Sequence, residues 1–331
     1  MAICENLPDL PAALRGLITE IPPGRVATCG GLATALGDLR ASRWIGHFLL
    51  HHEHSPPCPC HRVVRVKGLL GGFVQGGATI KKDLLLREGI RISAESIDLQ
   101  RYGFAEFSTS QPLVQLRQEQ ERLQRKWRER RWRRLPQRIG GIDVSYSRRG
   151  EAVASYTVVE VDTGELVWST TIATPVSFPY IPTYLTFREL PALLAAVDAA
   201  RQAGSLAELT LVDGTGILHP RRLGIASHLG IVAQIATVGV TKSLLCGRVE
   251  GKPRLGTPAP VFCDDALLGM AIIPTHDRAP LYVSAGQGVD LETALAAVAG
   301  TLRGRRLPEP IYWADRLSRS AARAGSVAAV R

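Results

Sequence analysis

The chain has 331 residues, of which 45% are hydrophobic and 21% charged, and its formal net charge is +10. The length exceeds what one hydrophobic core usually serves, and the apolar content excludes a disordered chain, so we expect two folded domains. No apolar run is long enough to span a membrane and the N-terminus has no signal-peptide pattern, so a cytoplasmic protein with reduced thiols is expected. The positive charge favours polyanionic partners such as nucleic acid.

The first third of the chain predicts short helices. The first covers residues 12–20, while Thr28 and Ser42 are placed to cap helices over 29–37 and 43–52. The last two are joined by the short turn GDLRA, so they form a helix-turn-helix candidate. A further helix over 78–89 ends at Gly89, which suits a C-terminal cap.

The most basic part of the chain is residues 111–138, with 10 Lys and Arg against 3 Asp and Glu, a net charge of +7. Leu113, Leu116, Trp127 and Trp132 also give this segment an apolar side. Two roles stay open: packing of the apolar side on a domain, and contact with nucleic-acid phosphates.

Beyond about residue 96 the pattern changes to alternating strands and helices. Strands are predicted over 138–146, within 151–173 around a DTG turn, and over 207–214 and 237–243; helices are predicted over 187–204, 223–236 and 291–303. An antiparallel opening followed by this alternation predicts a mixed α/β layer fold. We therefore expect a mainly α domain over 1–95, a linker over 96–112, an α/β domain over 113–318 and a flexible tail over 319–331.

One short segment, HSPPCPCHRVVRVKG over residues 54–68, concentrates reactive side chains. Cys58 and Cys60 are too close in sequence for an unstrained disulfide. Zinc is chemically possible, since His51, His52, His54 and His61 are near, but C-x-C between prolines without a second paired motif is a poor zinc pattern. The remaining interpretations are an inert buried thiol and a Cys60 nucleophile with His61 as its base.

Four motifs follow one another over residues 8–91: IPPGRVATCGGLATALG, ASRWIGHFLLHH, PCHRVVRVKGLLGGFVQGG and KKDLLLREG. Together they resemble the DNA-binding domain of O6-alkylguanine-DNA alkyltransferases, to which PCHRV is highly specific. The resemblance implies a winged-helix-like helix-turn-helix that enters the minor groove and flips the damaged guanine into a pocket. Cys60 would take the alkyl group irreversibly, as a thiol whose pKa is lowered by a network of His61 and Glu88.

The same resemblance implies that Arg43 fills the gap left by the flipped base and that Lys81 lies near the reactive cysteine. The chain also departs from the family. Cys29 stands where a tyrosine helps to rotate the nucleotide, His52 stands in place of an asparagine, and Trp44 is bulky on a helix that must approach DNA. The family's separate N-terminal domain is not matched, as in the alkyltransferase-like proteins, which lack the cysteine that this chain keeps.

Three acids of the second domain occupy positions that suit a metal centre: Asp143 in GGIDVSY, Glu189 in YLTFRE and Asp213 in LVDGTG. Acids on neighbouring strands can supply the oxygen ligands that hard cations prefer. The ordinary alternative is that acids at strand ends cap helices or bind water, and that Glu189 forms a solvated ion pair with Arg188.

Six motifs spread over residues 111–318 extend this pattern: GIDVSY, PYIPTYLTFRE, LVDGTGILHPRRLGIASHLG, TVGVTKSLLCG, YVSAGQGVDLETAL and RLPEPIYWADRLS. They resemble endonuclease V. The resemblance implies a ribonuclease H-like fold and Mg2+-dependent nicking at the second phosphodiester bond 3′ to deoxyinosine, with Mn2+ able to replace Mg2+ and no organic cofactor. Asp143 and Asp213 would be metal ligands, with Glu189 as a third acid at the metal.

Further roles are implied by position in the same family. His219 and Lys242 would contact phosphate or assist catalysis. The segment PYIP, residues 179–182, would act as a wedge in which Tyr180, followed by Pro182, stacks at the lesion. Gly214 and Gly216 would form part of the backbone floor of the base pocket. Two departures are Gln287, which replaces a histidine and is expected to slow the nuclease if that histidine is catalytic, and Thr183, which replaces a common glycine.

These patterns together predict a two-domain DNA-repair fusion acting on double- and single-stranded DNA with alkylated or deaminated purines, with no membrane partner and no implied oligomer. Three alternatives remain: an active nuclease with an inert lesion-sensing first domain, a non-catalytic damage-recognition module, and a nuclease for inosine-containing RNA. The retained acids argue against the non-catalytic module, and the retained Cys60 and Glu88 argue against an inert first domain.

Overall fold

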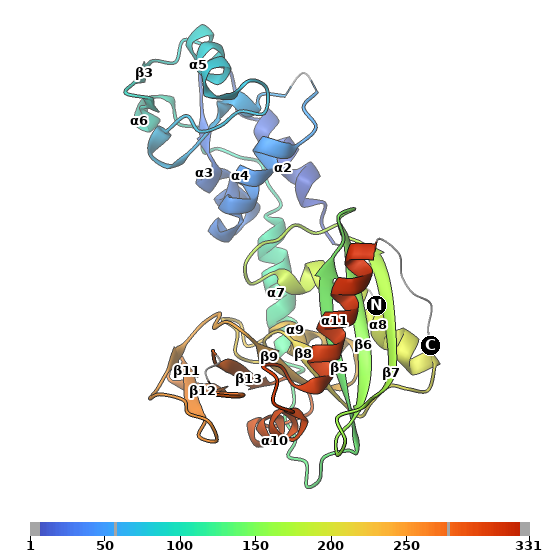
Figure 1. Ribbon diagram of the computed structural model, residues 1–331. Helices are drawn as coiled ribbons and strands as arrows, with labels where there is room; N and C mark the ends of the chain where they lie inside the picture. The colour runs from blue at the N-terminus through green and yellow to red at the C-terminus, as the bar shows by residue number, and fades with distance from the viewer. Residues whose placement is uncertain (1–6, 56–57, 277–278, 325–331) are drawn as a thin grey trace. The chain divides into compact units, whose positions relative to one another are not determined.

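The computed structural model describes residues 7–55, 58–276 and 279–324, which divide into two compact units (Figure 1). The first unit comprises the chain up to Gln118 together with Phe178–Tyr184, and the second comprises Glu119–Ser177 and the chain from Leu185 onwards. The expected organisation in two domains is therefore confirmed. No helix among the described residues has the length and hydropathy needed to cross a membrane.

The first unit is mainly helical, as predicted. Its helices are α2 (Leu10–Thr19), α3 (Cys29–Leu36), α4 (Ser42–His51), α5 (Gly77–Arg87) and α6 (Leu99–Tyr102). Two pairs of short strands complete it: β1 (Ala27–Thr28) runs parallel to β2 (Val63–Val64), and β3 (Ile92–Ser93) forms a hairpin with β4 (Ser96–Ile97). The β1–β2 pair fixes the start of α3 against the segment that follows Cys60.

The helix-turn-helix pair α3 and α4 forms at the predicted place, but only one of the two predicted caps is present. The Thr28 hydroxyl accepts a hydrogen bond from the Gly31 amide at 2.9 Å and so caps α3. Ser42 lies inside α4 instead, and its hydroxyl donates to the Leu39 carbonyl at 2.6 Å. The single turn η1 (Leu39–Ala41) supplies the backbone geometry that starts α4, so a side-chain cap is not needed.

The prediction of a linker over residues 96–112 is wrong for the first half of that range. Ile97 and Tyr102 are buried in the core of the first unit beside Val26 and Leu85. The boundary between the units falls inside α7 (Pro112–Gln124), between Gln118 and Glu119. The chain leaves the first core only after α6, because the hairpin and α6 supply apolar side chains that this small core needs.

The second unit is built on a nine-stranded mixed sheet with the order β10-β11-β12-β13-β9-β8-β5-β6-β7. The strands are β5 (Arg138–Tyr146), β6 (Glu151–Glu160), β7 (Leu166–Pro175), β8 (Leu209–Asp213), β9 (Ala236–Thr241), β10 (Arg248–Val249), β11 (Ala259–Cys263), β12 (Ala266–Ile272) and β13 (Leu281–Ala285). β5, β6 and β7 are antiparallel, whereas β8 and β9 run parallel to β5. This arrangement confirms the predicted mixed α/β fold.

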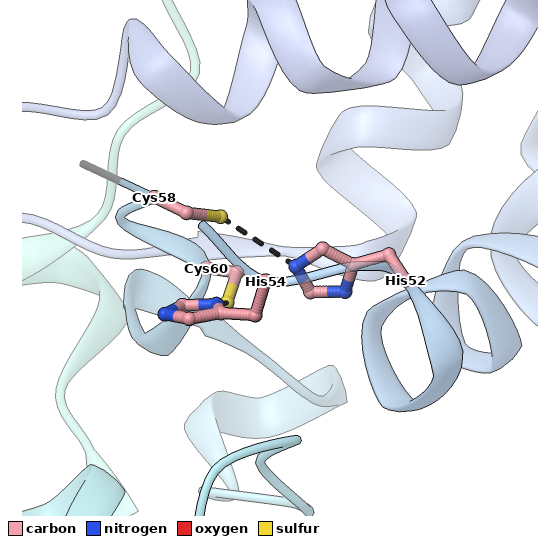
Figure 2. A group of neighbouring side chains, drawn as sticks. All are labelled: His52, His54, Cys58 and Cys60. Atoms are coloured by element: carbon pink, nitrogen blue, oxygen red, sulfur yellow. Dashed lines mark hydrogen bonds between the residues drawn. The ribbon is translucent and has the colours of Figure 1, made fainter. Parts of the chain in front are cut away.

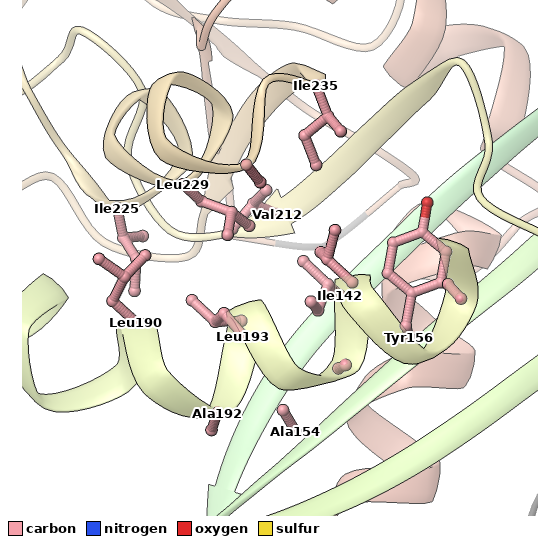
Figure 3. Close-up of a cluster of buried hydrophobic side chains, with 14 of the residues drawn as sticks. Ile142, Ala154, Tyr156, Leu190, Ala192, Leu193, Val212, Ile225, Leu229 and Ile235 are labelled. Atoms are coloured by element: carbon pink, nitrogen blue, oxygen red, sulfur yellow. The ribbon is translucent and has the colours of Figure 1, made fainter. Parts of the chain in front are cut away.

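Helices cover both faces of this sheet. α8 (Leu185–Gln202) and α9 (Ile225–Ala233) bury a cluster that includes Ile142, Leu193 and Leu229 on one face (Figure 3). α10 (Leu291–Thr301) and α11 (Glu309–Ala324) close the other face over a second cluster. Because side chains alternate along a strand, Ile142 faces the first cluster and its neighbour Asp143 faces α11.

α11 corrects the predicted flexible tail. Residues 319–324 belong to this helix, and the rest of the predicted tail, 325–331, lies outside the described residues. The helix can approach the sheet closely because a Cβ at Gly141 of β5 would lie 2.2 Å from the Pro310 backbone. The Thr157 hydroxyl fastens the same turn by donating to the Pro310 carbonyl at 2.8 Å.

The basic segment contributes to this unit through its aromatic side chains. Trp127 and Trp132 pack against the second cluster, and the Trp132 indole donates to the Gly288 carbonyl at 2.9 Å. The predicted packing role is therefore confirmed. Contact with phosphates stays a prediction. The arginines between these tryptophans are exposed, as such contact requires: Arg128, Arg130 and Arg131.

Candidate active sites

Three carboxylates converge on the α11 side of the sheet. Asp143 and Asp213 face each other because β5 and β8 are parallel neighbours whose last paired residues are Ile142 and Val212. Asp315 reaches the same place from α11, and one carboxylate oxygen of each acid lies within 4.8 Å of the others. The sequence-based prediction brought Asp143 and Asp213 together correctly but missed Asp315, although it lies in the motif RLPEPIYWADRLS.

The electrostatics of this acid cluster are unfavourable without a cation. Burial, and then the charge of Asp213, raises the pKa of Asp143 well above its ordinary value. The Ser318 hydroxyl donates to Asp143 at 2.8 Å, and the Lys242 ammonium lies 2.5 Å from Asp213 and 3.7 Å from Asp315. The Arg319 guanidinium also lies 2.8 Å from Asp315, so among the described residues two cations face three acids, and full ionisation would leave one negative charge uncompensated.

This donor set fits a hard divalent cation. Carboxylate oxygens are the ligands that Mg2+ and Mn2+ prefer, and a small Mg2+ site needs only one or two carboxylates with substrate phosphate completing the shell. The raised pKa of Asp143 comes first from burial and then from repulsion by Asp213, and a bound cation would offset both. Asp143, Asp213 and Asp315 are therefore the residues that would hold such a cation.

Glu189, the third acid expected at the metal, is not one of these three. It lies buried in α8, and the Tyr146 hydroxyl donates to its Oε1 at 2.9 Å. Burial raises the pKa of Glu189 to about 7, and the charge of Asp213 adds to the rise. Glu189 thus stands near the cluster as a carboxyl group that can exchange a proton near neutral pH.

The other residues implied by position lie around the end of β8. His219 is buried, and its Nδ1 accepts a hydrogen bond from the Arg221 amide at 3.2 Å. A Cβ at Gly214 would lie 2.2 Å from the Ile225 side chain, and one at Gly216 would lie 2.0 Å from the Ala285 carbonyl oxygen. Both glycines are therefore required by close packing behind the acid cluster.

Gln287 lies at the opposite end of the sheet from Lys242, which argues against a direct catalytic role for this position, and the expected slowing of the nuclease stays a prediction. Its carbonyl accepts from the Thr237 amide at 2.9 Å, at the start of β9, whereas Lys242 follows the end of that strand. Thr237 and Lys242 are five residues apart, which corresponds to about 16 Å along a strand. The Gln287 side chain instead accepts from the Arg128 amide at 3.0 Å and positions the basic segment.

The predicted wedge belongs to the segment Phe178–Tyr184, which is grouped with the first unit. Tyr180 is 58% exposed, while Phe178 and Ile181 are buried and anchor the backbone on either side of it. Pro182 is half-buried. Thr183 has a φ of 71°, which is a left-handed conformation that a β-branched residue adopts only under strain. This value explains why glycine would suit the position.

In the first unit, Cys60 opens the single turn η2 (Cys60–Arg62) and is 4% exposed. His61 and Glu88 come together as implied, because His61 Nε2 lies 2.8 Å from Glu88 Oε1. Arg62 also donates to both carboxylate oxygens of Glu88. Burial alone would raise the pKa of Glu88, but the hydrogen bonds from Arg62 and then His61 lower it. Glu88 is therefore a fixed anion that orients the imidazole of His61.

The surroundings of the Cys60 sulfur differ from the expectation of a lone, low-pKa thiol. Burial, and then the neighbouring Cys58, raises the pKa of Cys60 to about 12. The nearest polar group recorded for Cys60 Sγ is His54 Nδ1 at 3.4 Å, and Cys58 Sγ lies 3.5 Å from His52 Nε2 (Figure 2). Among the described residues all five cysteines are free, so neither sulfur is in a disulfide.

Lys81 and Arg43 take different positions around this site. The buried Lys81 ammonium donates to the carbonyls of Val63 at 2.5 Å and Leu70 at 2.6 Å, and burial lowers its pKa to about 8. It therefore ties β2 to the loop that follows. Arg43 is exposed on α4 and lines a hollow of about 660 Å3 together with Cys29 and Lys81. This volume is in the range of small-molecule sites.

Comparison with known proteins gives the same division of the chain. Residues 119–316 match the endonuclease V family, and residues 12–90 match the DNA-binding domain of 6-O-methylguanine DNA methyltransferase. A bifunctional methyltransferase/endonuclease of Picrophilus torridus is 33% identical over 294 residues, 87% of this chain and 88% of that protein. An endonuclease V of Rippkaea orientalis is 38% identical over 182 residues, 54% of this chain and 78% of its own length.

Solved structures agree. Human endonuclease V is 34% identical with a TM-score of 0.59, and the match covers 64% of this chain and 99% of that one. Ciona intestinalis endonuclease V, bound to a 24mer DNA with an inosine followed by a ribo-adenosine, is 29% identical with a TM-score of 0.56, covering 63% and 96%. The sheet, its helices and the acid cluster define an α/β nuclease of DNA repair. The chain belongs to the endonuclease V family, with an alkyltransferase-type DNA-binding domain fused in front of the nuclease domain.

Proposed function

We propose that the second unit nicks DNA at the second phosphodiester bond 3′ to deoxyinosine in the presence of Mg2+ or Mn2+. The observation that carries this proposal is the convergence of Asp143, Asp213 and Asp315 beside one lysine. A hard cation held there would supply Lewis-acid polarisation of the scissile phosphate. Lys242 would bind a phosphate oxygen once the cation has neutralised the acids, and His219 would assist at the same site.

The exposed Tyr180 would stack on the base next to the lesion, since its neighbours Phe178 and Ile181 are buried and hold the backbone in place. Glu189, with its pKa of about 7, would exchange a proton with the reacting groups near neutral pH. The Ciona relative was solved with an inosine-containing DNA, which supports inosine as the lesion.

The test is nicking of a duplex with one deoxyinosine, with and without Mg2+. Asp143→Ala and Asp213→Ala should lose nicking by at least about a thousandfold, because each removes a ligand. The control is Asp198→Asn, a half-exposed acid of the same domain that pairs with Arg201, and it should nick normally. Nicking by either alanine variant at the rate of the parent protein would refute the site. A matched RNA probe with inosine tests the RNA alternative, which a preference for RNA would establish.

For the first unit we propose irreversible transfer of an alkyl group from O6-alkylguanine to Cys60. The observation that favours it is the hydrogen-bonded pair of Glu88 and His61, the residue that directly follows Cys60. The alkyl carbon would form a bond to Cys60 Sγ as its bond to O6 breaks, and the departing guanine would take up one proton, from the Cys60 thiol where it is protonated and from water where it is a thiolate. The hollow lined by Arg43 would take the flipped base.

Mass spectrometry after incubation with methylguanine DNA should find one added methyl on the peptide that carries Cys60. Cys60→Ser should lose the label, and Asp213→Ala should keep it because the nuclease chemistry is separate. Tight binding of the lesion without any label would establish the inert, lesion-sensing first domain instead.

A further inference from the structure

Four side chains that are spread over nine residues of sequence meet around one point in the first unit (Figure 2). They are His52, His54, Cys58 and Cys60, and one potential ligand atom of each lies within 4.8 Å of all the others. His52 follows the end of α4, and Cys60 opens η2. A set of two thiols and two imidazoles at this separation is the ligand set of a structural zinc site.

We propose that His52, His54, Cys58 and Cys60 bind one Zn2+ ion, which holds the Cys60 sulfur as a thiolate. The distances fit this assignment. Zinc–sulfur bonds of about 2.3 Å and zinc–nitrogen bonds of about 2.0 Å at a tetrahedral angle place sulfur and nitrogen about 3.5 Å apart. The two recorded separations are 3.4 Å between Cys60 Sγ and His54 Nδ1, and 3.5 Å between Cys58 Sγ and His52 Nε2.

The orientation of His52 also fits. Its Nδ1 lies 3.2 Å from the Phe48 carbonyl oxygen, and a carbonyl can only accept, so Nδ1 carries the hydrogen. His52 Nε2 therefore presents its lone pair toward Cys58. A backbone carbonyl that accepts from the far nitrogen of the ring is the usual support of a zinc-bound histidine. The Phe48 and His52 rings stack 5.2 Å apart, which fixes the plane of the imidazole.

The charge balance suits a buried position. Two thiolates neutralise the charge of Zn2+, and neutral imidazoles add none, so the loaded site carries no net charge. Cys60 and His52 are 4% and 8% exposed and His54 and Cys58 are half-buried, and a centre that is largely removed from water is tolerated best when it is neutral and saturated with ligands. The acid cluster of the nuclease, by contrast, offers only oxygen ligands and prefers a harder cation.

The site is tested on the full chain by replacing zinc with Co2+ in the presence of a phosphine reductant. Tetrahedral Co2+ with thiolate ligands gives visible d–d bands and a sulfur-to-cobalt charge-transfer band, which carboxylates alone cannot give. Purified chain should also contain about one zinc per molecule by elemental analysis. Absence of the charge-transfer band would overturn the proposal.

Two variants and two matched controls locate the ion. Cys58→Ser and His54→Ala should weaken zinc binding by more than about a hundredfold, which exceeds the effect of losing a mere supporting group. His51→Ala and Cys246→Ser should bind zinc as the parent does, because His51 is exposed and contacts its own helix, and Cys246 lies in the other unit. Zinc content unchanged in Cys58→Ser would refute the ligand set. Unchanged far-UV circular dichroism and binding of undamaged DNA by each variant check that the first unit is folded.

The ion binding itself does not depend on alkyl transfer, and only the use of the thiolate for that reaction rests on the proposed function. A chain that binds zinc but takes no methyl from methylguanine DNA would refute the transfer and leave the zinc site established. A chain that contains no zinc yet takes the methyl would refute the zinc site and leave the transfer established.

Discussion

Replacement of Asp143 by asparagine should stabilise the metal-free protein while it abolishes nicking. At an effective dielectric constant of about 20, two unit charges at 4.8 Å, the outer limit of separation in the acid cluster, repel by about 3.5 kcal/mol. Lys242 offsets part of this repulsion, so we expect Asp143→Asn to raise the free energy of unfolding by about 1–2 kcal/mol. Asparagine keeps an oxygen that accepts from the Ser318 hydroxyl, so the packing is preserved.

The pH dependence has a definite sign. The pKa of Asp143 is raised in the folded protein above its ordinary value of 3.8, so the folded state holds this proton more tightly than the unfolded state. Stability is therefore lost as pH rises above about 4, and asparagine removes that loss. The advantage of Asp143→Asn should be absent at pH 3 and should grow toward neutral pH.

Thermal unfolding in EDTA and in Mg2+ measures both effects. In EDTA the variant should unfold a few degrees higher than the parent, since 1 kcal/mol corresponds to about 2–4 °C in a domain of this size. Saturating Mg2+ should raise the melting temperature of the parent and leave the variant almost unchanged. Asp198→Asn should change stability by less than about 0.5 kcal/mol. A lower melting temperature for Asp143→Asn in EDTA would refute the electrostatic reasoning.

Three further variants test other parts of the structure. Burial lowers the pKa of His228 to about 4, so the free energy of unfolding should fall as pH falls from about 6.5 toward 4, by about 2 kcal/mol at pH 5. Urea unfolding of His228→Leu should not show this loss at low pH. Gln287→His should change the nicking rate by less than about twofold, since the side chain lies at the far end of the sheet; a rate tenfold higher would contradict this placement. Thr183→Gly should raise the free energy of unfolding by about 0.5–1 kcal/mol by relieving the left-handed backbone, and a loss of stability in denaturant would count against strain there.

Most helices and the central strands could be predicted because local chemistry and tertiary packing favour the same answer. Thr28 caps α3, Gly89 has a φ of 80° just past the end of α5, and the DTG turn connects β6 to β7 as expected. The pairing of Asp143 with Asp213 also followed from the sequence, because both acids lie on apolar strands that were expected to be neighbours. Alternation along those strands places the two acids on the same face.

The parts that could not be predicted depend on contacts between distant segments. β11 and β12 are short strands whose register is set by their neighbours, and Asp315 is brought to the acid cluster by a helix that is about a hundred residues beyond β8 in sequence. Gln287 follows the C-terminal end of β13. The antiparallel pairing of β13 with β9 places that end beside the start of β9, and the sequence alone does not show this pairing. A family motif identifies the residue at this position, but it does not show at which end of the sheet that residue lies.

The histidine and cysteine cluster shows how a spacing rule can fail. Pattern rules for zinc assume a tight knuckle that holds two ligands, followed by a second pair from another element. Here the end of α4 supplies His52, the following loop supplies His54 and Cys58, and η2 supplies Cys60. The four ligands therefore come together without a paired knuckle, because two helical elements and the segment between them bring them to one point.

Two donor sets of opposite character in separate units make the two proposed chemistries separable by choice of metal. Thiolate and imidazole ligands bind Zn2+ far more tightly than Mg2+, while three carboxylates accept Mg2+ and Mn2+ from a large free pool. Brief treatment with EDTA followed by excess Mg2+ should therefore restore nicking without restoring any zinc that had been removed. If methyl labelling of Cys60 falls under that treatment and returns only when zinc is added, the ion at His52, His54 and Cys58 acts on the alkyl-transfer step. If labelling is indifferent to zinc, the ion only holds the loop together, and the His61–Glu88 pair alone must prepare the thiol.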